Sequence, residues 1–196
     1  MKIIRKIAFC IVMLLACSSV ERAAAQSVAL RNNLLYDATL SPNLGIDVNL
    51  GSQWTLGGVV GLNLWDIDKD TNKKWRHLLI EPNVRRWLNG ETFHKGYLEG
   101  DLLYSHYNVG NTKIPFGLYD AVKDKRLQGD LFALGGKYGY SWILARTWRI
   151  EAEAGIAVGY AWFKEYECPT CGQQLGNGDR IFLLPQLGIN VVYIIN

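Results

Sequence analysis

The chain has 196 residues, of which 49% are hydrophobic and 20% are charged, and its formal net charge at pH 7 is +3. It contains no run of Lys and Arg residues, and nucleic acid is excluded as a partner because its binding requires a basic stripe. No segment offers the about 20 consecutive apolar residues of a membrane-spanning helix, so residence in a membrane would have to come from strands.

Residues 1–25 have the pattern of a secretory signal peptide. Three basic residues, Lys2, Arg5 and Lys6, precede the apolar run 7–16, and residues 23–25 are Ala-Ala-Ala, an A-x-A cleavage site before Gln26. Cleavage there leaves one domain, residues 26–196, in which the 21 Lys and Arg and 18 Asp and Glu residues become 17 and 17. An alternative is lipoprotein processing with acylation of Cys17, which follows Leu14-Leu15-Ala16.

Apolar and polar residues alternate with the period of two that β-strands show. The pattern is clearest in residues 148–162, where every second residue from Trp148 to Trp162 is apolar. The sequence predicts eight strands, at residues 28–36, 43–50, 54–64, 76–88, 95–107, 129–143, 148–162 and 180–195. Because several are as long as transmembrane strands, the predicted fold is all-β, an eight-stranded antiparallel up-and-down transmembrane β-barrel.

The connections between the predicted strands alternate between short and long. Residues 51–53, 89–94 and 144–147 form short connections, whereas 66–75, 108–128 and 164–179 form long and mostly polar ones. Outer-membrane barrels have short periplasmic turns and longer outer loops. The pattern therefore predicts an N-terminus on the periplasmic side, with residues 37–42 as an outer connection that is short for its side.

The seven Trp residues all fall near predicted strand ends. Trp54, Trp87, Trp142 and Trp148 lie near periplasmic ends, and Trp65, Trp75 and Trp162 lie near outer ends. Since Trp prefers the level of the lipid headgroups, this placement predicts two aromatic girdles.

The polar face of the predicted strands carries charges that would point into the barrel. They are Asp47, Glu81, Arg85, Glu99, Asp101, Lys137, Arg149, Glu151 and Glu153. An eight-stranded barrel has room inside only for side chains, so we expect a structural plug of paired charges rather than a catalytic or conducting lining. The alternative is a soluble lipocalin-like barrel with its apolar face inward; strand length, Trp placement and loop asymmetry favour the membrane form.

Predicted strand 28–36 fits the alternation poorly. Either choice of phase turns Asn32 or Asn33 toward lipid. A bulge, or a position near the interface, would resolve the conflict.

His77 and His106 near outer strand ends raise the alternative of an enzyme. Some outer-membrane barrels modify lipids at their outer mouth, and Ser105 and the acidic residues Asp66, Asp68 and Asp70 are close in sequence. Nothing in the sequence fixes the mutual geometry of these side chains, and an isolated His at a strand end is usually structural.

The long connection 108–128 contains an unusually apolar stretch, 114–119. Phe116, Leu118 and Tyr119 form its candidate binding surface. Such a patch either folds onto the barrel mouth as a lid or presents a surface to a partner.

Cys168 and Cys171 lie three residues apart in the last long connection. Two thiolates at this spacing resemble half of a tetrahedral metal site, but no second pair or nearby His completes the four ligands. A loop disulfide or free thiols is the expectation, with a metal knuckle as the alternative. We expect no cofactor.

Several short motifs together resemble an uncharacterised Bacteroidetes family of exported outer-membrane β-barrels, catalogued as a domain of unknown function. They are Asn33-Leu34-Leu35-Tyr36-Asp37, Pro42-Asn43-Leu44-Gly45, Lys74-Trp75-Arg76-His77, Tyr107-Asn108-Val109-Gly110, Pro115-Phe116-Gly117, Tyr138-Gly139-Tyr140 and Tyr166-Glu167-Cys168 with Cys171-Gly172. The resemblance covers nearly the whole mature chain and brings no established catalytic residues. It implies an outer-membrane setting and a link to surface-fimbria or cell-envelope genes.

The expected function is a small non-enzymatic barrel in contact with outer-membrane lipid. Its outer loops would engage envelope, surface or fimbrial components. The alternative is an outer-membrane acyltransferase or deacylase that uses a His at the outer mouth.

Overall fold

The computed structural model describes residues 27–51, 53–68, 73–111, 125–167 and 172–195. Its elements are β1 (Val28–Asn33), α2 (Leu34–Ala38), β2 (Asn43–Asn49), β3 (Trp54–Asn63), β4 (Asp66–Asp68), β5 (Lys73–Trp87), β6 (Lys95–Gly110), β7 (Lys125–Ile143), β8 (Trp148–Glu167) and β9 (Gln174–Ile195). No helix in these ranges has the length and apolar run needed to cross a membrane.

Eight of the strands in the described ranges form a closed antiparallel ring. Sequence neighbours pair from β1 to β3 and from β5 to β9, β3 pairs with β5, and β1 pairs with β9. The short strand β4 pairs with β5 beyond the end of β3. The predicted all-β arrangement of eight antiparallel strands is therefore confirmed.

The two faces of the ring have opposite polarity. Many large side chains on the outward face are at least half exposed, among them Leu44, Leu56, Leu98, Leu102, Phe132, Leu134, Ile156, Val158, Ile181 and Leu183. The inward face buries charged groups such as Arg85, Glu99 and Glu151 almost completely. The lipocalin-like alternative, with apolar residues inward and charges outward, is therefore wrong.

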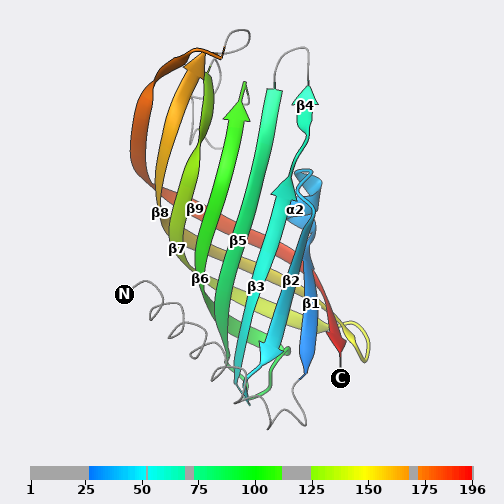
Figure 1. Cartoon of the computed structure of the whole chain (residues 1–196). Helices are drawn as coiled ribbons and strands as arrows, with labels where there is room; N and C mark the ends of the chain where they lie inside the picture. Colours follow the sequence, from blue (N-terminus) through cyan, green and yellow to red (C-terminus); the bar gives the residue numbers. More distant parts are fainter. Residues whose placement is uncertain (1–26, 52, 69–72, 112–124, 168–171, 196) are drawn as a thin grey trace, which may run out of the picture.

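The ring is lopsided in height (Figure 1). β1 and β2 have six and seven residues, whereas β8 and β9 have 20 and 22. β1 reaches β9 only from Asn190 to Ile195, and no described strand pairs with the same edge of β9 above Asn190. At the upper end of Figure 1, β5 to β9 therefore continue past the β1–β2 hairpin as a curved sheet with a free edge at β9.

The prediction of a strand over 28–36 is wrong after Asn33, where α2 begins. The Asn33 side chain accepts a hydrogen bond from Leu35 N at 2.9 Å and so caps the helix. The Asn43 side chain bonds the Asn33 backbone at 2.7 and 2.9 Å, which closes the hairpin at this height. Asn32 is on the outward face near the strand end and donates to the Asn43 carbonyl, so its conflict with the alternation is resolved without a bulge.

The upper ends of β5 to β9 lie beyond their predicted limits. β5 begins at Lys73, β6 continues to Gly110, β7 begins at Lys125, β8 continues to Glu167, and β9 begins at Gln174. The three long connections are shorter than predicted, because backbone pairing continues through polar residues after the apolar alternation has ended.

The girdle prediction is wrong for two of the seven Trp residues. Trp87 is completely buried on the inward face, and Trp75 packs against the inward residues Val109 and Leu127. Trp54, Trp65, Trp142, Trp148 and Trp162 are 40–47% exposed.

Candidate functional site

The interior of the ring is arranged in layers, and its middle layer is a network of ion pairs. Arg85 is its centre: the guanidinium contacts Glu99, lies 3.1 Å from Glu151 and 3.4 Å from Glu153, and is 3.7 Å from Asp47. All five side chains are at least 96% buried. One cation therefore joins carboxylates from three other strands.

Lys137 extends the network across the ring. Its Nζ lies 2.6 Å from Glu81, 2.8 Å from Glu99 and 3.5 Å from Glu153. A cation on β7 thus forms ion pairs with carboxylates on β5, β6 and β8, including β5, which is not a neighbour of β7 in the sheet.

Arg31 is a third buried cation, and it was not among the predicted interior charges. It is 2% exposed and lies 3.4 Å from Asp47 and from Glu99 and 3.6 Å from Glu153. The uncertain phase of predicted strand 28–36 concealed it. Choosing the phase that turns Ala29 and Asn33 inward would have identified Arg31, because it lies two residues from each of them.

Two of the predicted interior charges lie apart from the cations of this network. Asp101 is buried and accepts a hydrogen bond from the amide of Gln186 at 2.8 Å. Arg149 lies at the lower end of β8, where it donates to the carbonyls of Ala145 at 2.7 Å and Phe93 at 3.2 Å. The remaining seven meet in the middle layer. The described residues contain no His, Cys, Asp and Glu cluster of metal-binding form.

An aromatic layer closes the lower end below the network. Trp87 and Tyr97 are fully buried with ring centroids 4.8 Å apart, and Phe93 packs on Trp87 at 5.7 Å. Tyr97 also donates to Glu153 at 2.8 Å and places its ring 4.5 Å from the Arg85 guanidinium. The aromatic layer and the network therefore form one packed unit.

Above the network the interior becomes apolar and is filled by side chains. Leu103, Ala133 and Ala157 are buried, with Leu79 and Leu184 packed against them. A cavity of about 10 Å³ lies between the network and Tyr36 of α2, which is room for about one water molecule. A cavity of this size does not admit an organic substrate.

The two histidines of the enzyme hypothesis point to opposite faces. His77 is on the inward face beside Trp75, with ring centroids 6.2 Å apart, whereas His106 is on the outward face. Ser105 is buried on the inward face, and Asp66 is paired with Arg76 at 2.8 Å. These residues do not form one site. Asp70 and the side chain of Asp68 lie outside the described residues.

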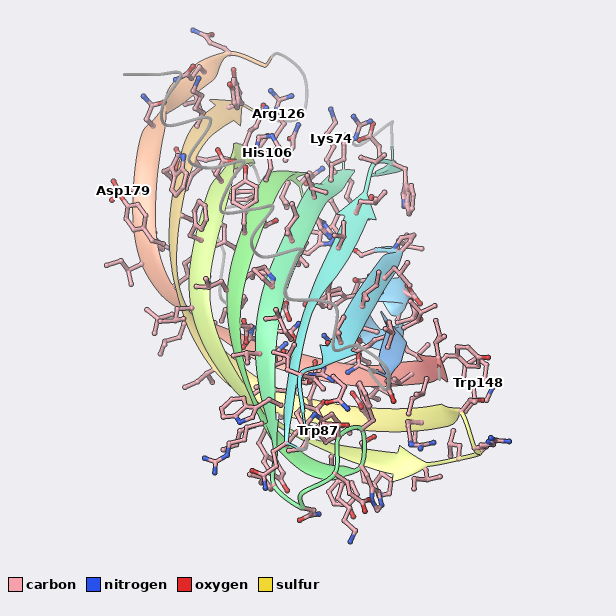
Figure 2. The ribbon with its side chains drawn as sticks, turned by 60° about the horizontal axis from the view of Figure 1, so that its bottom comes forward. Lys74, Trp87, His106, Arg126, Trp148 and Asp179 are labelled. Atoms are coloured by element: carbon pink, nitrogen blue, oxygen red, sulfur yellow. The ribbon has the colours of Figure 1, made fainter. Side chains whose placement is uncertain are left out.

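His106 belongs instead to a cluster on the outward face near the upper end (Figure 2). Its Nδ1 lies 2.9 Å from Asp130 Oδ1, and the Tyr104 hydroxyl donates to the same oxygen at 2.8 Å. Beside them is an open groove of about 390 Å³, lined by His106, Gln128, Asp130, Trp162, Lys164, Tyr166 and Asn177 among others. Sequence reasoning missed this groove because its residues come from four strands.

Several predicted features lie outside the described residues: the signal peptide 1–25 with Cys17, the patch of Phe116, Leu118 and Tyr119, and the pair Cys168 and Cys171.

The comparisons with known proteins give one match. The model of a family described as "Protein of unknown function (DUF3575)" matches residues 9–195. No curated protein and no solved structure matches the chain.

Proposed function

We propose that this chain, which belongs to the DUF3575 family of proteins of unknown function, is a small non-enzymatic β-barrel of the bacterial outer membrane whose outward-facing end engages envelope, surface or fimbrial components. The observation that carries the proposal is the inverted polarity of the ring. Soluble monomers rarely expose a contiguous apolar patch larger than a few hundred Å². Here Leu134, Ile156, Ile181 and Leu183 are 61–72% exposed, while Arg85 and Glu151 are fully buried.

The arrangement of the chain supports the same setting. A closed ring of strands satisfies backbone hydrogen bonds internally, which hydrocarbon requires, and the exposed Trp residues cluster near the two ends of the strands. The export signal predicted in residues 1–25 is consistent with this location. The short connections would face the periplasm, and the upper end in Figure 1 would face outward.

A binding or structural role fits the filled interior. The aromatic layer, the ion-pair network and the apolar layer occupy the inside, so the surface available to a partner is the upper end of β5 to β9. The link to surface-fimbria or envelope genes that the sequence resemblance implies is consistent with such a partner.

Site-specific photo-cross-linking in cells tests this role. Probes at Lys125 and Gln174 report on the upper end, and matched probes at Lys95 and Arg146 report on the lower end. We expect discrete adducts with an envelope or surface protein from the upper positions alone. Absence of such adducts, or the same adducts from both ends, would contradict the proposed role.

A second candidate function is lipid modification, and the contact of His106 with Asp130 is the observation that favours it. A carboxylate that holds one imidazole nitrogen leaves the other available as a general base. Comparing lipid A from a deletion strain, its parent and a His106→Gln strain distinguishes the two functions. Acyl or phosphate differences that depend on His106 would support the enzyme, and identical lipid A would support the non-enzymatic role.

A further inference from the structure

The outward face of β6 to β9 changes character in regular steps toward its upper end. The pairing registers place one residue from each strand in a common row, and successive rows are two residues apart. From low to high the rows are Leu102, Leu134, Val158 and Leu183; then Tyr104, Phe132, Tyr160 and Ile181; then His106, Asp130, Trp162 and Asp179; then Asn108, Gln128, Lys164 and Asn177.

This sequence of rows matches the cross-section of one lipid leaflet. The lowest row is aliphatic, the next is mostly aromatic, and the upper two are polar or charged apart from Trp162. Three steps of two residues cover roughly 20 Å along a strand, and less along the membrane normal when the strands tilt. The groove of about 390 Å³ includes residues of the two upper rows, so it lies at the level of headgroups rather than of acyl chains.

In and beside the groove, the carboxylates receive hydrogen bonds from neighbouring side chains, whereas Lys164 has no carboxylate partner among the described residues. The carboxylate of Asp130 is already engaged by His106 and Tyr104, and that of Asp179 accepts a hydrogen bond from Tyr160 at 3.0 Å. In the part of the chain that the structure describes, no carboxylate pairs with Lys164.

Arg126 adds a second cation beside the groove, one row above Lys164. Its guanidinium stacks on Tyr166 at 4.5 Å, and among the described residues its Nε has no hydrogen-bond partner. Figure 2 shows His106 and Arg126 near the same end of the sheet. Among the described residues, neither Lys164 nor Arg126 is therefore paired with a carboxylate.

We infer that this groove binds the phosphate-bearing headgroup of an outer-leaflet lipid, with Lys164 and Arg126 at the phosphate and the acyl chains on the rows of Phe132 and Leu134. The inference rests on the proposed outer-membrane location and deepens it by naming a ligand class. Arg and Lys are the side chains suited to phosphate, and charge-assisted bonds are the stronger ones. A free phosphate ion would use the cations but not the apolar rows, so a lipid is the occupant that uses the whole face.

Native mass spectrometry of the purified full chain in detergent micelles tests the inference. The probes are diphosphoryl lipid A, phosphatidylethanolamine as a lipid without net charge, and inorganic phosphate as a competitor. The test variant is Lys164→Gln with Arg126→Gln. The matched control is Arg86→Gln with Arg146→Gln, which removes two cations from the lower end.

We expect lipid A to bind the native protein and the control equally, and the test variant roughly tenfold more weakly. Phosphatidylethanolamine should bind weakly to all three, and millimolar phosphate should not displace lipid A. Equal binding of lipid A by the test variant, equal retention of both lipids, or displacement by phosphate would overturn the inference. If one of these results is found for a protein that fractionates with outer membranes, only the lipid site is refuted and the proposed location stands. Recovery as a soluble protein would instead refute the location.

Discussion

At the scale of single residues, the interior contains more buried carboxyl groups than buried cationic groups. Among the described residues the buried carboxylates are Asp47, Glu81, Glu99, Asp101, Glu151 and Glu153, and the buried cations are Arg31, Arg85 and Lys137. Because a buried charge without a partner is costly, the network should tolerate the loss of a carboxylate better than the loss of a cation.

Arg85 and Glu151 provide the matched test of this asymmetry. Arg85→Gln leaves Glu99, Glu151 and Glu153 without their shared partner, and we expect it to lower the free energy of unfolding by about 3–5 kcal/mol. Glu151→Gln keeps an acceptor for Arg85 and removes one of the surplus carboxyl groups, so it should cost less. Denaturant unfolding of protein inserted in lipid vesicles measures both. Equal costs would contradict the asymmetry.

Two glycines near the network differ in the space around them. A Cβ at Gly155 would lie 2.1 Å from the Gly136 carbonyl oxygen and 2.7 Å from Lys137 Cα, both backbone atoms. A Cβ at Gly136 would meet nothing closer than 3.8 Å. We predict that Gly155→Ala destabilises by about 1–3 kcal/mol while Gly136→Ala is tolerated. The same unfolding measurement compares the destabilisation of the two variants. Similar values would contradict the prediction and show that the backbone around Gly155 shifts freely.

The inward or outward direction of a side chain could be predicted from the sequence wherever the alternation of strand residues alone decides it. Glu81, Arg85, Glu99 and Lys137 follow clear alternation, so their inward direction could be predicted. The identity of each ion-pair partner could not, because partners are set by pairings such as that of β5 with β6. Arg31 was missed because the alternation around it is interrupted by the Asn residues that end β1.

At the scale of elements, β9 has two different edges. Ile194 N donates a hydrogen bond to Thr147 O, which directly precedes β8. Because N–H groups along a strand point alternately to its two edges, the even-numbered residues of β9 direct their N–H groups toward β8. Odd-numbered residues then direct theirs to the opposite edge, where β1 ends opposite Asn190. Pro185 fits this arrangement, since proline lacks an N–H and occurs in sheets mainly at free edges.

Proline substitution at adjacent positions tests this edge. Leu183→Pro removes an N–H that points to the free edge, so we expect the protein to fold and keep nearly native stability. Leu184→Pro removes a ladder hydrogen bond to Ala157 and should cost about 1–3 kcal/mol or prevent folding. Leu183→Ala and Leu184→Ala control for the loss of side chains. Heat-modifiable migration on gels and thermal unfolding report the result; equal damage from both prolines would contradict the assignment of edges.

Strand existence could be predicted from the sequence, whereas strand ends could not. Alternation identifies the apolar parts of β5 to β9 but stops at polar residues such as Lys125 and Lys164, although pairing continues through them. The α2 helix was missed for a different reason. Its start depends on the Asn33 cap and on Asn43, ten residues away, and neither bond is visible as a periodic pattern.

At the scale of the whole molecule, a filled interior should not conduct ions. Trp87, Tyr97 and Phe93 close the lower end, the ion pairs occupy the middle, and the interior cavity beside them holds about 10 Å³. We predict that the protein inserted in planar bilayers gives no steady single-channel conductance above that of a bilayer without protein. A stable open channel would show that the interior rearranges or that the layers do not persist.

The closed ring could be predicted from strand number and length, because eight strands of alternating polarity have few other ways to bury their polar face. The unequal heights of its two sides could not, since they follow from the local end of β1 at Asn33. The outward groove could not be predicted either, because the registers of four strands must be known before His106, Asp130, Trp162 and Asp179 can be placed in one row.

The most direct test of the central claim is the location of the protein in the cell, read together with its migration on gels before and after heating. We predict that the exported chain fractionates with outer membranes, requires detergent for extraction, and changes its migration when boiling unfolds the ring. Recovery as a soluble monomer of the periplasm without detergent would contradict the proposal.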